Sequence, residues 1–151
     1  MKRVVAVVDS NVVVSGLLTS DGGAPTATIL DAMLSGELWF LLSVDLLAEY
    51  REVLLRPAIQ TRHRLDETEV DVFLTTIAEN AVTCEPGVPP TQPPDRGDFH
   101  LWSMLASRED AVLVTGDQAL VDSPPGWARV MTPREVAKLI RPSIPESRGG
   151  L

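Results

Sequence analysis

Runs of aliphatic residues recur along the chain and predict the strands of an α/β fold. Residues 4–8 form a valine-rich run that ends at an acid, which is typical of a parallel strand buried on both faces. Shorter apolar segments predict four more strands, at residues 38–42, 81–84, 111–115 and 127–131. Each of these segments is followed by polar or turn-forming residues, so each is expected to end close to solvent.

The segments between these strands carry apolar residues at helical spacing. Pro25 suits the first turn of a helix that Gly36 ends, and Ser43 is placed to cap a helix that runs to Arg56 and is ended by Pro57. Further helices are expected to start near Asp66, where Glu69 completes a capping box, and near Asp95, Asp117 and Thr132. The segment through Gly22 and Gly23 and the proline-rich segment 85–94 are expected to be loops.

Strands that alternate with helices predict a parallel sheet with helices on both faces. A length of 151 residues fits one domain, which we expect to cover residues 1–141, with a flexible tail at 142–151. The longest apolar stretch, residues 38–42, is too short to cross a bilayer. The single cysteine, Cys84, excludes an intrachain disulfide and a thiolate zinc site, so a cytoplasmic location is expected.

Four acids stand where these elements end or turn inward. Asp9 and Asp117 follow the first and fourth predicted strands, Asp98 shares the apolar face of its helix, and Glu49 lies at the margin of an apolar stripe. Because the carboxyl ends of parallel strands meet at one edge of a sheet, we expect these acids to converge. Clustered carboxylates repel one another, and a hard cation such as Mg²⁺ relieves that repulsion. The pattern therefore predicts a metal site.

Polar neighbours extend this candidate site. Asn11 is placed to orient the Asp9 carboxylate or bind a metal-bound water, with Ser10 a weaker candidate for the same role. Thr115 can hydrogen-bond a nearby carboxylate or phosphate. Asp95 is expected to cap its helix, with a secondary metal or water role as an alternative. Each acid taken alone also has an ordinary explanation, as a helix cap, a turn residue or a solvated side chain. The joint occurrence of four such acids favours the metal site.

Charge bears on the class of partner. The net charge of −8 does not favour nucleic-acid binding. A basic partner protein is equally compatible with this charge. The cations are nevertheless clustered, and the cluster consists of Arg51, Arg56, Arg62 and Arg64. His63 and His100 are isolated from any nucleophile motif and are expected to be ordinary surface or internally bonded histidines.

Five blocks of sequence resemble PIN-domain ribonucleases, in order and with suitable gaps. Residues 7–16 read Val-Val-Asp-Ser-Asn-Val-Val-Val-Ser-Gly and resemble the opening block of that family. Residues 43–57 resemble the second block of a subgroup that contains the toxins of toxin-antitoxin pairs, the VapC-like proteins. The third, fourth and closing blocks resemble residues 95–106, 113–120 and 132–135.

This resemblance implies a three-layer α/β/α sandwich around a five-stranded parallel sheet. It implies that Asp9, Glu49, Asp98 and Asp117 form the catalytic, metal-binding site, supported by Asn11 and Thr115. The implied activity is RNA cleavage that depends on Mg²⁺ or Mn²⁺. For such an activity we expect a metal-activated water to attack the phosphodiester and the four clustered arginines to contact the RNA backbone. The subgroup also implies a cognate antitoxin and a homodimer. One residue departs from the family pattern, since Gly97 replaces an inner acid of the third block.

Two other classes of function are compatible with an α/β fold of this kind. A non-catalytic PIN-like module would dock a partner protein or RNA, and Gly97 is the residue that favours it. A phosphoacceptor receiver needs an acidic pair after the first strand and a lysine after the last. The chain instead has Asp9 followed by Ser10, and no lysine near residues 127–131, which disfavours a receiver.

Overall fold

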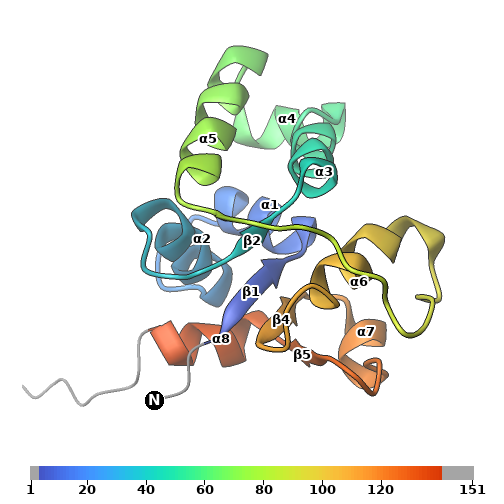
Figure 1. Cartoon of the computed structure of the whole chain (residues 1–151). Helices are drawn as coiled ribbons and strands as arrows, with labels where there is room; N and C mark the ends of the chain where they lie inside the picture. Colours follow the sequence, from blue (N-terminus) through green and yellow to red (C-terminus); the bar gives the residue numbers. More distant parts are fainter. Residues whose placement is uncertain (1–3, 141–151) are drawn as a thin grey trace, which may run out of the picture.

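The computed structural model describes residues 4–140, so the predicted tail at 142–151 lies outside the described residues. Figure 1 shows short strands surrounded by helices. The strands are β1 (Val5–Val8), β2 (Leu41–Leu42), β3 (Val82–Thr83), β4 (Ala111–Val114) and β5 (Arg129–Met131). The helices are α1 (Ser10–Leu18), α2 (Pro25–Ser35), α3 (Val44–Leu54), α4 (Pro57–His63), α5 (Glu67–Glu79), the 3₁₀ helix η1 (Arg96–Asp98), α6 (Phe99–Leu105), α7 (Gln118–Asp122) and α8 (Pro133–Ile140).

The strands pair in parallel, as predicted, but they do not form the single five-stranded sheet that was expected. One sheet has the order β1-β4-β5, and a second contains only β2 and β3. The two sheets meet at an isolated parallel bridge between Ala6 and Phe40, where the Ala6 amide also donates to the Trp39 carbonyl over 2.9 Å. The predicted strand at 38–42 is reduced to two paired residues, because its contact with β1 ends at this bridge and Ser43 already caps α3.

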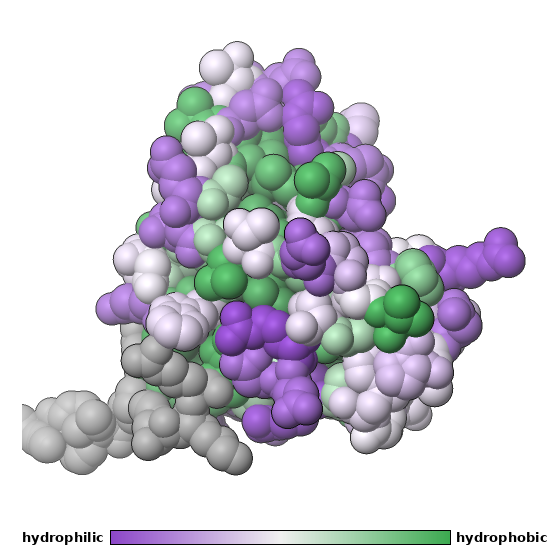
Figure 2. All heavy atoms as spheres, viewed as in Figure 1, coloured by the Kyte–Doolittle hydropathy of each residue, from purple (hydrophilic) through white to green (hydrophobic). Residues whose placement is uncertain are grey.

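The centre of the molecule is apolar and is built around β1 and β4. All four residues of each strand are buried, which explains their uninterrupted aliphatic sequences. The large exposed apolar side chains, such as Trp39 and Phe99, come from separate segments. On the face seen in Figure 2, apolar and hydrophilic residues are accordingly interspersed. No helix within residues 4–140 is long and apolar enough to cross a membrane.

Helix α1 was missed by the sequence analysis, which expected a loop after the first strand. The segment contains valines and a glycine, which have low helix propensity, so tertiary packing decides its conformation. Val12 and Val13 are buried in the core. A Cβ on Gly16 would lie 2.6 Å from the Thr26 carbonyl oxygen, so the glycine allows α1 to approach the start of α2.

Several helix boundaries also differ from expectation. Helix α3 ends at Leu54, and Pro57 starts the separate helix α4 instead of only ending its predecessor. The helix predicted from Asp95 begins as a 3₁₀ turn before continuing as α6. The predicted capping box of α5 is confirmed, with reciprocal bonds of 2.8 and 3.0 Å between Asp66 and Glu69.

Candidate active site

Asp9 lies at the carboxyl edge of the larger sheet, between β1 and α1. Its backbone amide donates to the Val114 carbonyl over 2.9 Å, so the pairing of β1 with β4 fixes the position of its Cα. The hydroxyl of Thr115, the residue after β4, donates to Asp9 Oδ2 over 2.8 Å. Asp9 is only 8% exposed and Thr115 is fully buried. Parallel pairing has therefore brought together two polar groups that are 106 positions apart in the chain.

Asn11 bridges these two residues from the first turn of α1. Its amide group lies 3.4 Å from Asp9 Oδ2 and 3.3 Å from the Thr115 hydroxyl, and its carbonyl oxygen accepts from the Gly116 amide over 3.1 Å. Burial raises the pKa of Asp9 above its ordinary value, although the Thr115 bond opposes this. The Asp9 carboxylate is thus held in one orientation in a weakly solvated place.

Glu49 reaches toward this edge from α3. One carboxylate oxygen accepts from the Ser10 hydroxyl over 2.8 Å, and the other lies 2.8 Å from His100 Nε2. The bond to His100 lowers the pKa of Glu49, and the same bond raises the pKa of His100. Arg56 forms its ion pair with Glu52, one helical turn away, and not with Glu49.

Asp98 is the last residue of η1 and lies directly before α6. Partial burial raises its pKa to about 6, and neighbouring carboxylates add to the shift. These carboxylates belong to Asp9, Asp95, Glu49 and Asp117. Acids from distant parts of the sequence therefore lie close enough to influence one proton equilibrium, as expected for converging carboxylates.

Asp117 and Asp95 both serve as helix caps. The carboxylate of Asp117 accepts from the Ala119 amide over 3.0 Å at the start of α7. That of Asp95 accepts from the Gly97 amide over 2.9 Å at the start of η1. The capping role predicted for Asp95 is confirmed, and the ordinary alternative for Asp117 also holds. Both acids nevertheless contribute to the raised pKa of Asp98, so they lie near the other carboxylates.

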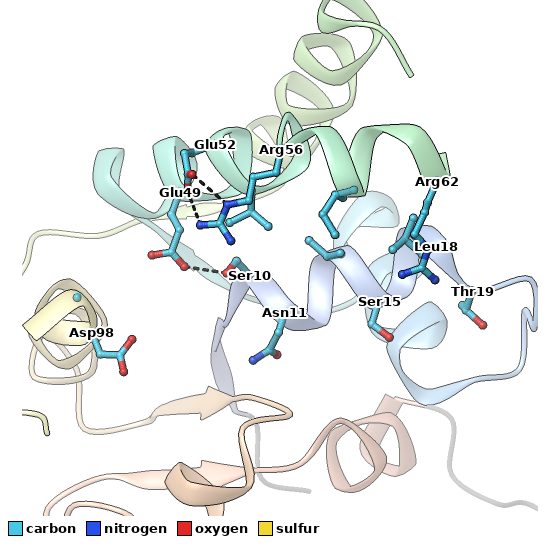
Figure 3. A pocket seen from close by; sticks show the side chains of 14 residues that line it. Ser10, Asn11, Ser15, Leu18, Thr19, Glu49, Glu52, Arg56, Arg62 and Asp98 are labelled. Atoms are coloured by element: carbon cyan, nitrogen blue, oxygen red, sulfur yellow. Dashed lines mark hydrogen bonds and ion pairs between the residues drawn. The ribbon is translucent and has the colours of Figure 1, made fainter. Parts of the chain in front are cut away.

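A cavity of about 770 Å³ opens beside these acids and runs between α1, α3 and α4. In Figure 3, Asp98, Glu49 and Asn11 lie at one end of this cavity and Arg62 and Thr19 at the other. The lining residues are Ser10, Asn11, Val14, Ser15, Leu18, Thr19, Glu49, Glu52, Val53, Arg56, Ile59, Arg62, Gly97 and Asp98. The cavity thus has a carboxylate end and a cationic end, and apolar side chains form part of its lining. Its size suits a ligand or a short polymer segment.

The four clustered arginines differ in their surroundings. Arg51 binds two acids of α5, and Arg56 binds Glu52, so both are already paired with carboxylates. Arg62 lines the cavity and forms no ion pair with any residue in the range 4–140. Arg64 follows α4 with a positive φ of 62° and does not line the cavity. Arg62 is therefore the cluster member best placed to contact a ligand there.

The donor set suits a hard divalent cation. The gathered groups are carboxylates with hydroxyl and amide neighbours, which are ligands that such a cation prefers. The raised pKa values of Asp9 and Asp98 come first from burial and then from neighbouring carboxylates, and a bound cation would offset both effects. No three His, Cys, Asp or Glu side chains in the described part of the chain already form the ligand shell of one ion. Magnesium does not need such a shell, because it commonly binds one or two carboxylates and keeps several waters.

His100 is the site residue that the sequence analysis missed. Its side chain bonds to Glu49, 51 positions away, and the contact exists only because α3 packs near α6. No local motif marks such a pair, and the short separation from Asp98 was the only available signal. His63, by contrast, is internally bonded as expected, to the Leu54 carbonyl and the Leu65 amide.

Comparison with known proteins agrees with this architecture. Neither the curated proteins nor the solved structures contained a match to the chain. The model of the PIN domain family matches residues 5–119, a range that includes Asp9, Glu49, Asp98 and Asp117. This match covers most of the sequence and extends from β1 into α7. The chain therefore belongs to the PIN domain family, whose members are typically metal-dependent nucleases.

Proposed function

We propose that this chain is an endoribonuclease that uses Mg²⁺ or Mn²⁺ to hydrolyse RNA phosphodiester bonds. The observation that carries the proposal is the convergence of carboxylates from four separate segments beside one cavity. Two of these acids, Asp9 and Asp98, have pKa values raised by burial and by the neighbouring carboxylates, which is common at functional sites. The family match supports the same class of chemistry.

Asp9 and Asp98 are the residues that would hold the cation, with Asp117 near enough to act through an intervening water. When bound, the cation would neutralise charge on the scissile phosphate and activate a water as the nucleophile. Asn11 and Thr115 keep the Asp9 carboxylate in a fixed orientation through their bonds to it. Glu49 faces the same space and is placed either to bind the cation or to orient the attacking water.

The cavity is the proposed path of the RNA strand. Its lining includes Val14, Leu18, Val53 and Ile59, which offer apolar surface for a base or ribose. Arg62 at the far end would contact a backbone phosphate, since its guanidinium has no carboxylate partner among residues 4–140. Arg51, Arg56 and Arg64 remain weaker candidates for backbone contact, because they are either paired with acids or outside the cavity.

The test is cleavage of single-stranded RNA by the purified chain with Mg²⁺, with Mn²⁺ or with a chelator. We expect cleavage that requires the cation and is lost in Asp98→Asn, with the fold retained by circular dichroism. The matched control is Asp31→Asn, which removes an exposed acid of α2 and should cleave normally. Equal cation-dependent cleavage by Asp98→Asn and the wild type would refute the assignment.

A non-catalytic binding module is the second candidate. Two observations favour it, namely Gly97 at the position where the related sequences often carry an acid and the lack of a preformed three-ligand group in the described residues. Calorimetry with Mn²⁺ distinguishes the two functions. Micromolar binding that disappears in Asp9→Asn supports the nuclease, whereas no binding together with no cleavage supports the module.

We further propose that the nuclease is the toxin of a toxin-antitoxin pair, acting as a homodimer and held inactive by a cognate antitoxin. The support is the resemblance of residues 43–57 to the toxin subgroup. The test is a search beside the gene for a small reading frame that encodes a DNA-binding protein, followed by its co-expression with the chain. Growth arrest on expression of the chain alone, relieved by the neighbour, supports the toxin role. Unaffected growth together with cleavage in vitro would leave a solitary nuclease.

A further inference from the structure

The Glu49 carboxylate is held at both of its oxygens. Ser10, next to Asp9, donates to Oε2 over 2.8 Å, and His100, two residues beyond Asp98, contacts Oε1 over 2.8 Å. These bonds connect α3 with α1 on one side and with α6 on the other. The orientation of Glu49 is therefore set by the same two segments that carry the proposed cation ligands.

The surroundings of His100 are unusual for a residue that only supports the fold. Its side chain is 17% exposed, and its Nδ1 atom is buried with no hydrogen-bond partner among the described residues. An unpaired buried nitrogen opposes folding, so an aliphatic side chain would serve packing better at this position. The bond from Nε2 to Glu49 is what distinguishes histidine from such a residue.

We propose that His100 is a positioning residue for phosphodiester cleavage. Its imidazole holds the Glu49 carboxylate toward the carboxylate end of the cavity. This inference rests on the proposed ribonuclease function. Glu49 has several rotatable bonds, and Figure 3 shows Arg56 beside it as an alternative partner. Without His100, the Glu49 carboxylate keeps only its bond to Ser10, and it can then turn toward Arg56 and away from the carboxylate end of the cavity. Loss of the imidazole bond should then lower kcat without weakening the binding of RNA.

The first experiment compares His100→Leu with His100→Gln in single-stranded RNA cleavage with Mn²⁺. Leucine keeps bulk but has no donor, whereas glutamine offers an amide donor to Glu49. For His100→Leu we expect kcat to fall by about 10- to 100-fold, the usual effect of losing a residue that orients a metal-site group, while KM changes by less than about threefold. His100→Gln should recover most of kcat. The control is His63→Leu, which removes the other histidine and should retain kcat per folded molecule.

A second experiment tests whether His100 acts through Glu49. In a double-mutant cycle, His100→Leu should add little to the loss of kcat already caused by Glu49→Gln, because both changes remove one arrangement. A third readout needs neither metal nor RNA. The bond predicts a slowly exchanging imidazole N–H signal of His100 in the NMR spectrum of the metal-free protein, and Glu49→Ala should abolish it.

The outcomes separate this inference from the function on which it rests. If the wild type cleaves RNA and folded His100→Leu cleaves with the same kcat, the positioning role is wrong and the ribonuclease function stands. Full additivity in the double-mutant cycle, or a loss in His100→Gln equal to that in His100→Leu, would also overturn it. If the wild type cleaves no RNA under any cation, both proposals fail, even with the N–H signal present.

Discussion

Replacement of Asp98 by asparagine should stabilise the metal-free protein at neutral pH. Its pKa is raised from 3.8 to about 6, so the folded state holds the ionised form at a cost. A shift of this size corresponds to about 3 kcal/mol at full effect, but the side chain is only partly buried, and solvent screening reduces the expected gain to about 1 kcal/mol. For a chain of this length that gain raises Tm by about 2–4 °C.

The sign of the effect fixes its pH dependence. Below pH 3.8 the Asp98 carboxyl is protonated in both the folded and the unfolded state, so wild type and Asp98→Asn should be equally stable there. The wild type then loses stability relative to the variant as pH rises from about 4 to about 6, and the difference stays constant above that range. Differential scanning calorimetry at pH 3 and pH 7.5, with a chelator present, measures both limits.

Added Mn²⁺ should reverse the order of stability at pH 7.5. A cation at 100 times its dissociation constant stabilises the wild type by about 2.7 kcal/mol, more than the gain from the substitution, and Asp98→Asn should respond much less. Asp31→Asn serves as the control, because an exposed acid of α2 should change stability by less than about 0.5 kcal/mol under either condition. A lower Tm for Asp98→Asn in the metal-free protein at pH 7.5 would refute the electrostatic account of the site.

Three further substitutions test other parts of the structure. Gly16→Ala should destabilise the protein by about 1–3 kcal/mol in urea unfolding, because its Cβ would lie 2.6 Å from a backbone oxygen of α2. Unchanged stability would show that α1 and α2 are not in close contact at this position. In the inactive Asp98→Asn background, Arg62→Gln should weaken RNA binding and reduce the salt dependence of the affinity by about one phosphate contact. Arg64→Gln should do neither, and equal effects of the two variants would place the RNA outside the cavity. Gly97→Asp should tighten Mn²⁺ binding in calorimetry by adding an acid at the rim of the cavity, and weaker binding would contradict the proposed position of the cation.

The sequence predicted best those features that depend on local pattern and strand order. The buried strands β1 and β4 follow from uninterrupted aliphatic runs, and their pairing brings Asp9 and Thr115 into contact as a parallel sheet requires. The capping box at Asp66 is also local and was found. These features can be predicted from residues close together in the sequence, or from the rule that the carboxyl ends of parallel strands lie at one edge of a sheet.

The features that were missed depend on tertiary packing. Helix α1 has unfavourable local propensity and is stabilised by burial of Val12 and Val13 and by close approach at Gly16. The sheet divides in two because β1 and the segment before β2 are paired as strands only at Ala6 and Phe40, which no alternation pattern can reveal. His100 belongs to the site only through the packing of α3 near α6.

The division of the acids between two kinds of support has a mechanical consequence. Asp9 and its bonded neighbour Thr115 are anchored to the paired strands β1 and β4, whereas Glu49 and Asp98 belong to helical segments beside this sheet. A cation held by Asp9 together with Asp98 or Glu49 would link the sheet to these helical segments. Core substitutions that weaken the packing of these helical segments against the sheet should therefore lower the affinity for the cation, even when they lie far from any carboxylate. This loss of affinity should precede global unfolding.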